Sequence, residues 1–158
     1  LLRTNLVKNR EKFYNEDNWH TDTDTCFDLL RGTDMGFVHQ VLSFCRYHDT
    51  SETATFADRY NTYLPGALIC LLKYGPLYLS ENEYKARLLW NVHIYYAFLA
   101  KSYLKGREKD FFLYHKKELA KLGYRPTLVK LIQASIAVLV RQPKKALGAA
   151  LGMDKRFA

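Results

Sequence analysis

The chain contains 158 residues, of which 48% are hydrophobic and 25% are charged, and its formal net charge is +8. A chain of this length and apolar content has the size of one domain and can bury a core, which excludes wholesale disorder. The positive charge is concentrated in residues 101–158, where 14 Lys and Arg stand against 4 Asp and Glu. This basic part is either a solvated, lysine-rich helix face or a surface for phosphate, anionic lipid or nucleic acid.

The first residue and the cysteines bear on the origin and compartment of the chain. It begins at Leu1 without a capping or turn signal, so we expect a fragment of a longer protein. Cys26, Cys45 and Cys70 stand in apolar surroundings, without a C-x-x-C motif or a histidine at zinc spacing. We expect buried free thiols, which are typical of a reducing compartment, and hence a cytoplasmic location. Apolar runs such as residues 135–140 are far too short to cross a bilayer.

The first fifty residues combine short elements of different periodicity. A strand is predicted at residues 1–7, a polar loop follows as far as Trp19, and a short helix is predicted near residues 23–30. A turn then leads into a second predicted strand at residues 37–47, whose first half is rich in β-branched and aromatic residues.

From residue 50 onward the pattern becomes helical. Pro65 suits the first turn of a helix that we expect to end at Gly75-Pro76. Residues 80–83, Ser-Glu-Asn-Glu, form a capping box, which opens the next helix. Apolar residues then recur every three or four positions through residues 84–103, which predicts one long helix whose tyrosines pack in the core.

Two further helices are predicted in the basic C-terminal part. The first occupies residues 107–122 and is closed by Gly123, and the second occupies residues 127–141 and is interrupted by Pro143. The second is amphipathic and basic, because lysines and arginines flank its apolar face. We expect residues 127–151 either to pack on the preceding helices or to make peripheral contact with the anionic cytoplasmic leaflet.

The stretch with the most chemical information is residues 19–30, Trp-His-Thr-Asp-Thr-Asp-Thr-Cys-Phe-Asp-Leu-Leu. Asp22 and Asp24 stand at the start of the predicted helix, where the positive helix end favours negative charge. These carboxylates either cap the helix or take part in catalysis. His20 and His39 have no partner at metal spacing and are expected in loops or at the surface.

A predicted strand, residues 36–42 (Gly-Phe-Val-His-Gln-Val-Leu), follows the acidic helix and leads into residues 46–48, Arg-Tyr-His. This order resembles one block of the inverting GT-A glycosyltransferases of family 2. In that family a Glu-Asp pair opens a helix, a turn and a strand follow, and the strand ends in an Arg-x-His element. Thr21-Asp22 stands at the Glu-Asp position, with Thr21 in place of the glutamate. The resemblance covers about the first fifty residues, and only the general style of the rest.

The resemblance implies a fold that is mostly α with a small α/β part. Residues 1–50 would form the acceptor-side, C-terminal part of a GT-A catalytic domain, and residues 51–158 a helical subdomain with a basic amphipathic tail. The donor-binding half, with its Asp-x-Asp motif, would lie upstream of Leu1. The fragment alone is therefore expected to be catalytically inert.

The resemblance also assigns roles within the acidic stretch. Asp22 falls at the position of the catalytic aspartate, the general base that deprotonates the acceptor hydroxyl as its oxygen attacks the anomeric carbon opposite the leaving nucleoside diphosphate. Asp24 takes that role if the register is shifted by two residues. Trp19 precedes the motif and either stacks on the acceptor sugar or packs in the core.

The Arg-x-His element is assigned to the leaving group and the metal. His48 matches the family's histidine near the diphosphate and would complete the coordination of Mg²⁺ or Mn²⁺, whose other protein ligand comes from the Asp-x-Asp motif. Arg46 either faces the diphosphate as a fixed cation or forms an ion pair with Asp28 or Asp49.

The expected activity is inverting transfer of a sugar from a nucleotide sugar to a hydroxyl of a glycan or lipid-linked acceptor, in the cytoplasm at the inner face of the membrane. A split domain exposes apolar surface on which two copies would form a homodimer. This interpretation predicts no nucleic acid partner. The alternative is a non-catalytic basic helical module that binds a membrane surface or nucleic acid.

Overall fold

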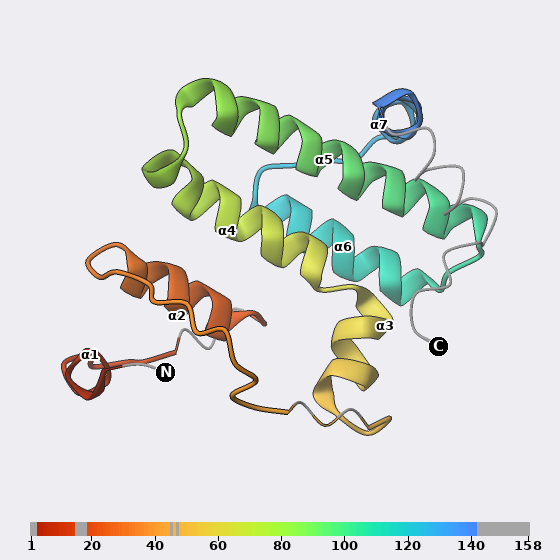
Figure 1. Ribbon diagram of the computed structural model, residues 1–158. Coiled ribbons are helices and arrows are strands. Elements are labelled where there is room, and N and C mark those ends of the chain that lie inside the picture. The colour runs from red at the N-terminus through yellow and green to blue at the C-terminus, as the bar shows by residue number, and fades with distance from the viewer. Residues whose placement is uncertain (1–2, 15–18, 45, 47, 142–158) are drawn as a thin grey trace. The chain divides into compact units, whose positions relative to one another are not determined.

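The computed structural model describes residues 3–14, 19–44, 46 and 48–141 (Figure 1). The described part of the chain is mostly helical, as predicted, and contains no strand. Its helices, in chain order, are α1 (Thr4–Lys8), α2 (Thr21–Leu30), the π-helix η1 (Thr53–Ala57), α3 (Asp58–Tyr60), α4 (Tyr63–Tyr78), α5 (Glu81–Leu104), α6 (Lys109–Lys121) and α7 (Leu128–Arg141).

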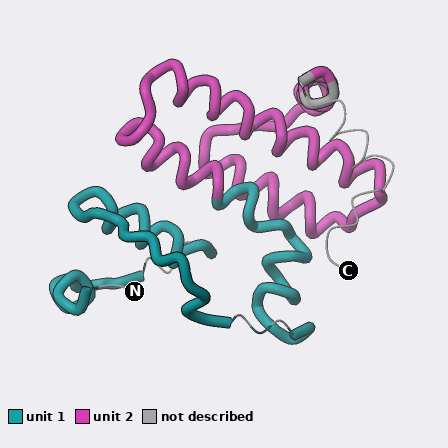
Figure 2. Tube along the Cα trace, in the orientation of Figure 1, with its two compact units in different colours: residues 1–66 teal, residues 67–158 magenta. Residues whose placement is uncertain are grey.

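The chain forms two compact units, residues 1–66 and residues 67–158 (Figure 2). Helix α4 contains the boundary between them. The division predicted after residue 50 separates a catalytic part from a helical subdomain of a longer enzyme, and it stays a prediction.

Neither predicted strand is formed in the described residues. Thr4–Lys8 form α1 instead. Residues 37–44 form no regular element, and most of their large apolar side chains are exposed. Residues 1–2, 45 and 47 of the two predictions lie outside the described part. For the described residues of both segments, the strand predictions are wrong. A strand needs a neighbour to pair its backbone N–H and C=O groups, and β-propensity alone does not supply one.

Helix α4 begins where predicted but continues beyond its predicted end. Pro65 lies in its first turn, where a missing N–H is tolerated. The helix then runs through Pro76, and the amide of Leu79 still donates to the carbonyl of Gly75 at 2.9 Å. Gly75 lies close to α5, since a Cβ atom there would stand 2.7 Å from Cδ2 of Tyr84. The predicted stop at Gly75-Pro76 is wrong because this packing holds the last turn, where Pro76 removes only one backbone hydrogen bond.

The other helix boundaries follow the predicted cap and turn chemistry. Ser80 Oγ accepts from the amide of Glu83 at 3.4 Å, and the Glu83 carboxylate accepts from the amide of Ser80 at 3.0 Å, so the capping box is confirmed. Gly106 and Gly123 follow α5 and α6 with φ values of 68° and 78°, a left-handed conformation that favours glycine. Helix α7 also lies where predicted, while Pro143, its predicted interruption, is outside the described residues.

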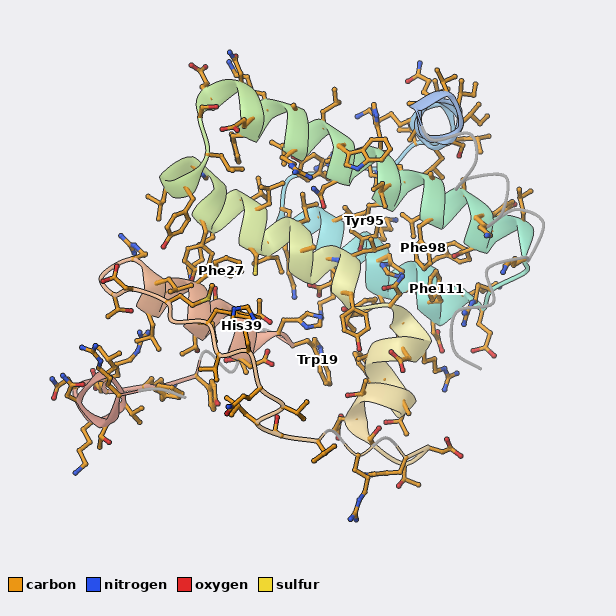
Figure 3. The ribbon with its side chains drawn as sticks, in the orientation of Figure 1. Trp19, Phe27, His39, Tyr95, Phe98 and Phe111 are labelled. Carbon is orange, nitrogen blue, oxygen red and sulfur yellow. The ribbon has the colours of Figure 1, made fainter. Side chains whose placement is uncertain are left out.

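The second unit encloses an aromatic core. Figure 3 shows Tyr95 and Phe98 of α5 close to Phe111 of α6, and the ring centroids of Phe98 and Phe111 are 5.9 Å apart. The Tyr95 hydroxyl lies 2.7 Å from Nδ1 of the buried His115. Burial raises the pKa of Tyr95, so this phenol stays protonated. The predicted core role of the tyrosines is confirmed at Tyr95 and Tyr96, but it is wrong at Tyr103, which is 71% exposed.

Two of the three cysteines are described, and both carry free thiols. Cys70 in α4 is half-buried, but Cys26 in α2 is exposed, so the prediction of buried thiols is wrong at Cys26. Apolar neighbours in sequence do not determine which face of a helix is covered. Cys45 lies outside the described residues. Within the described ranges, none of the helices is both long and apolar enough to cross a membrane.

Candidate functional site

The acidic stretch forms helix α2, whose start is held by His20. His20 occupies the position before the first helical residue, and its carbonyl accepts from the amide of Asp24 at 3.0 Å. Its ring atom Nε2 lies 3.1 Å from Oγ1 of Thr62. The ring also packs on Gly66, where an added Cβ would stand 2.3 Å from His20 Cδ2. The imidazole, on a residue that lies in the turn before α2, thus ties the beginning of this helix to residues 62–66.

The segment that follows residue 50 places an aromatic ring against Trp19. The π-helix η1 carries Phe56. Helix α3 is followed by Asn61, whose φ of 50° turns the chain. The rings of Trp19 and Phe56 stack with centroids 4.1 Å apart and an interplanar angle of 18°. Tyr60 extends the stack, 4.8 Å from Phe56.

The Trp19 side chain is supported on one face and accessible elsewhere. Stacking covers one face of the indole, yet 54% of the residue stays exposed (Figure 3). Aromatic rings held in this way bind the apolar C–H faces of ligands. Trp19 therefore packs on Phe56 without being a buried core residue, and its predicted contact with an acceptor sugar stays a prediction.

The two aspartates of the motif have opposite environments. Asp22 is exposed, and its Oδ1 accepts from the amide of Thr23 at 2.7 Å. Asp24 is buried, with 4% of its surface exposed. Residues two apart on a helix point about 200° away from each other, so only one of the pair can face solvent. Asp22 is the carboxylate that a second molecule can reach. Its bond to the Thr23 amide supports the first turn of α2. The N-cap is His20, without a side-chain cap, so neither aspartate is the N-cap that the capping alternative predicts.

Asp28, in the last part of α2, belongs to a small polar network. Its carboxylate forms an ion pair with Arg10 at 2.6 Å and a longer one with Arg31 at 3.8 Å. Thr25 of the same helix donates to the carbonyl of Phe13 at 3.1 Å. These contacts fasten residues 10–13 to α2. They also supply Asp28 with cations other than Arg46, which had been considered as its partner.

The Arg-x-His element lies in an exposed segment. Arg46 and His48 are both exposed, and Nδ1 of His48 lies 3.1 Å from Oγ1 of Thr50. The amide of Ser51 donates to the His48 carbonyl at 3.0 Å, which closes a turn. Across the described ranges, no hydrogen bond or ion pair joins the Asp22 carboxylate to the His48 ring. Tyr47, which lies between Arg46 and His48 in the sequence, is outside the described residues.

A divalent metal would need ligands that this region does not gather. His48 presents one imidazole, and in the part of the chain that is described no three His, Cys, Asp or Glu side chains form a group able to hold a metal ion. Mg²⁺ and Mn²⁺ prefer several oxygen ligands. The described residues therefore do not fit a metal site by themselves.

Comparisons with known proteins leave the function to be inferred from the residues. A scan against models of protein families gave no match, and neither a curated protein nor a solved structure matched the chain significantly. The contacts that sequence reasoning missed are those of His20 with Thr62 and Gly66, and of Trp19 with Phe56. Each joins residues far apart in the sequence, and no local pattern signals them.

Proposed function

We propose that this chain supplies the acceptor side of an inverting, GT-A-type family 2 glycosyltransferase, with Asp22 as its general base. The observation that carries the proposal is the contrast within the acidic motif. Asp22 is exposed at the first turn of α2, three residues after the half-exposed Trp19, whereas Asp24 is buried. A general base must reach the proton that it removes, and this contrast favours Asp22.

The proposed reaction is a single displacement. Asp22 takes the proton of an acceptor hydroxyl while that oxygen bonds to the anomeric carbon of a nucleotide sugar. The bond from this carbon to the diphosphate breaks, and the nucleoside diphosphate leaves on the opposite face, so the configuration inverts. Oδ1 of Asp22 is engaged with the Thr23 amide, which leaves Oδ2 for the acceptor. The exposed part of Trp19 offers an apolar surface for the acceptor sugar.

The GT-A part of the proposal concerns residues 37–44. These residues have strand-like composition but form no strand, and Phe44 is 94% exposed. Single exposed apolar residues are normal, but a run of them marks a surface that another element covers. In the proposed enzyme the donor-binding half covers this run, and its side chains become buried there.

The nucleotide sugar and the metal belong to the same proposal. In the intact enzyme the Asp-x-Asp carboxylates of the donor-binding half would hold Mg²⁺ or Mn²⁺, and His48 would be the ligand from this chain. Arg46, which is exposed, meets the leaving diphosphate as a cation. No step is assigned to the metal, because the described residues do not form its site.

Substitution of Asp22 in the intact enzyme tests the proposal. Asp22→Asn should lower kcat by about 10²–10⁴-fold, because acceptor deprotonation is lost, and should leave the KM for the nucleotide sugar unchanged. The matched control is Asp34→Asn, which alters an exposed aspartate in the loop after α2 and should keep full activity. An unchanged kcat in Asp22→Asn would reject Asp22 as the base.

The buried neighbour separates the two candidate bases. Asp24→Asn should lower the free energy of unfolding by about 1–3 kcal/mol, because it alters a buried polar group. Asp22→Asn should change this free energy much less. If Asp24→Asn abolishes turnover at unchanged stability while Asp22→Asn keeps activity, the register is shifted and Asp24 is the base.

The second candidate, a non-catalytic basic module, is favoured by the exposed aliphatic residues of α7. It predicts that charge reversal at Lys144 and Lys145, which lie outside the described residues, abolishes function while Asp22→Asn leaves it intact. The transferase predicts the opposite result. The two outcomes can be read from one set of variants assayed in parallel.

A further inference from the structure

Helix α7 packs on α5 along one face and leaves the other uncovered (Figure 1). Ala134 is buried at the packed face. Five aliphatic side chains of α7 are between 53% and 76% exposed: Leu128, Val129, Ile132, Ile136 and Val140. A helix that only completes the core of its own unit would not expose this many large aliphatic residues.

The exposed residues form one continuous stripe. At about 100° per residue, the five side chains span an arc of roughly 120° around the axis of α7. The centre of that arc lies roughly 180° from Ala134, the residue buried in the packing with α5. The stripe therefore faces away from α5, on which α7 packs, and it covers more than three turns of the helix.

The chain segment that contains the stripe carries charges of a single sign. From Leu119 to Met153 the sequence contains no Asp or Glu, and it contains six Lys and Arg residues. Lys130 within α7 and Arg125 just before it are both exposed. A partner of this surface must therefore combine negative charge with an apolar interior that accepts aliphatic side chains.

We propose that the outer face of α7 binds an anionic lipid surface, lying parallel to it with the aliphatic stripe inserted below the headgroups. Helices that combine an aliphatic face with a net positive charge bind membranes in this way. A second copy of the chain fits less well, because two stripes would bring like charges together. Nucleic acid fits less well too, because α7 contains no aromatic residue for base stacking. The proposal is independent of the transferase activity.

Vesicle sedimentation with the full 158-residue chain tests this inference. The chain should sediment with vesicles of phosphatidylcholine that contain about one third phosphatidylglycerol, and should stay in solution with pure phosphatidylcholine. Binding should weaken when salt is raised from 0.1 M to 1 M, because the screening length falls from about 10 Å to about 3 Å.

Paired variants locate the lipid-binding surface on α7. Ile132→Glu together with Ile136→Glu should weaken vesicle binding by at least about tenfold, because two carboxylates replace inserted aliphatic groups. Leu113→Glu, at an exposed leucine of α6, is the matched control and should bind like the parent chain. Circular dichroism of all three proteins should show equal helix content, because the replaced residues are exposed.

Three results would overturn the proposal. The first is absence of binding to the anionic vesicles. The second is a loss of binding in Leu113→Glu that is, on a logarithmic scale, at least half of the loss in the α7 double variant. Because the control adds one carboxylate and the double variant adds two, that result would mean that net charge alone is sensed. The third is a lipid-free dimer of the parent chain that the double variant converts to a monomer, which would make the stripe an interface between copies.

Discussion

The two units of the protein bury very different shares of their apolar residues. In residues 67–158, α5 and α6 enclose aromatic and aliphatic side chains that are almost fully buried, Tyr95, Phe111 and Leu119 among them. In residues 1–66, Leu29 is buried, while the large apolar side chains of residues 35–44 are largely exposed. The chemically informative motif thus lies in the unit with the smaller core.

The difference shows what each unit requires for stability. A helical hairpin satisfies its backbone hydrogen bonds internally and needs only packing partners, which α4, α5 and α6 give one another. A run such as residues 37–44 needs partners for its backbone as well as for its side chains. We therefore expect the second unit to be stable by itself, and the first unit to gain stability from whatever covers that run.

Truncation of the core should give the largest effect. Leu119→Ala should lower the free energy of unfolding by about 2–5 kcal/mol, because Leu119 is 0% exposed and its removal leaves a cavity. Urea denaturation followed by circular dichroism measures the change. A loss below about 1 kcal/mol would mean that the second unit is more loosely packed than its burial indicates.

The matched change in the first unit is Phe44→Ala. In the 158-residue chain it should alter the same free energy by no more than about 0.5 kcal/mol, because Phe44 is exposed. In an intact GT-A enzyme the side chain is expected to be buried, and the cost should rise to about 3–5 kcal/mol. Equal, small costs in both contexts would contradict the proposed covering of residues 37–44.

Crowding at Gly66 should give a smaller effect, centred on the start of α2. In Gly66→Ala the new Cβ would stand 2.3 Å from Cδ2 of His20, so the imidazole must move and its contact with Thr62 is weakened. Overpacking of this kind costs about 1–3 kcal/mol. The histidine resonances in an NMR spectrum should shift, and turnover of the intact enzyme should fall because Asp22 follows His20 closely.

Gly36→Ala is the control for that substitution. A Cβ at Gly36 meets nothing within 4 Å, and the residue does not have the positive φ that favours glycine. Alanine there should be neutral, or stabilise by about 0.4–1 kcal/mol through the unfolded state. If the two alanine variants behave alike, His20 does not hold the start of α2.

Local chemistry made most of the helices predictable. The capping box at residues 80–83 and the glycines Gly106 and Gly123 act within four residues, so the sequence contains both partners of each interaction. The stop at Gly75-Pro76 failed because Gly75 packs against Tyr84, which is a tertiary contact. The strand at residues 37–47 failed because strand pairing depends on another segment.

The sequence predicted the helix that carries the candidate site, but not which of its side chains are buried. The sequence indicated that a helix with acidic residues opens near Asp22, and the helical period placed Asp22 and Asp24 on different faces. It could not indicate which of the two is buried, because that depends on what packs against α2. The link between His20 and Thr62 spans 42 residues and has no local signal.

Helices α2 and α5 both have acidic residues in their first turn, but they differ in how the turn is capped. Helix α2 begins at His20 without a side-chain cap, while α5 begins with the complete box of Ser80 and Glu83. Hydrogen bonds from the Ser80 side chain and backbone lower the pKa of Glu83 below its usual value of 4.5. Each carboxylate uses one oxygen for its own helix, because Glu83 accepts both of its bonds from Ser80 at Oε2 and Asp22 accepts the amide of Thr23 at Oδ1.

The smallest expected effect follows from this cap. Ser80→Ala should lower the free energy of unfolding by about 1 kcal/mol at pH 7. Because the pKa of Glu83 is lower in the folded than in the unfolded protein, its contribution is present above pH 4.5 and is lost as the pH falls through the folded-state value. The difference between Ser80→Ala and the parent chain should therefore shrink in urea titrations below pH 4.5. The control is Ser43→Ala, at an exposed serine outside any helix, which should change neither the free energy of unfolding at pH 7 nor its pH dependence. If the loss of stability in Ser80→Ala is the same at every pH, Glu83 does not contribute through its charged form.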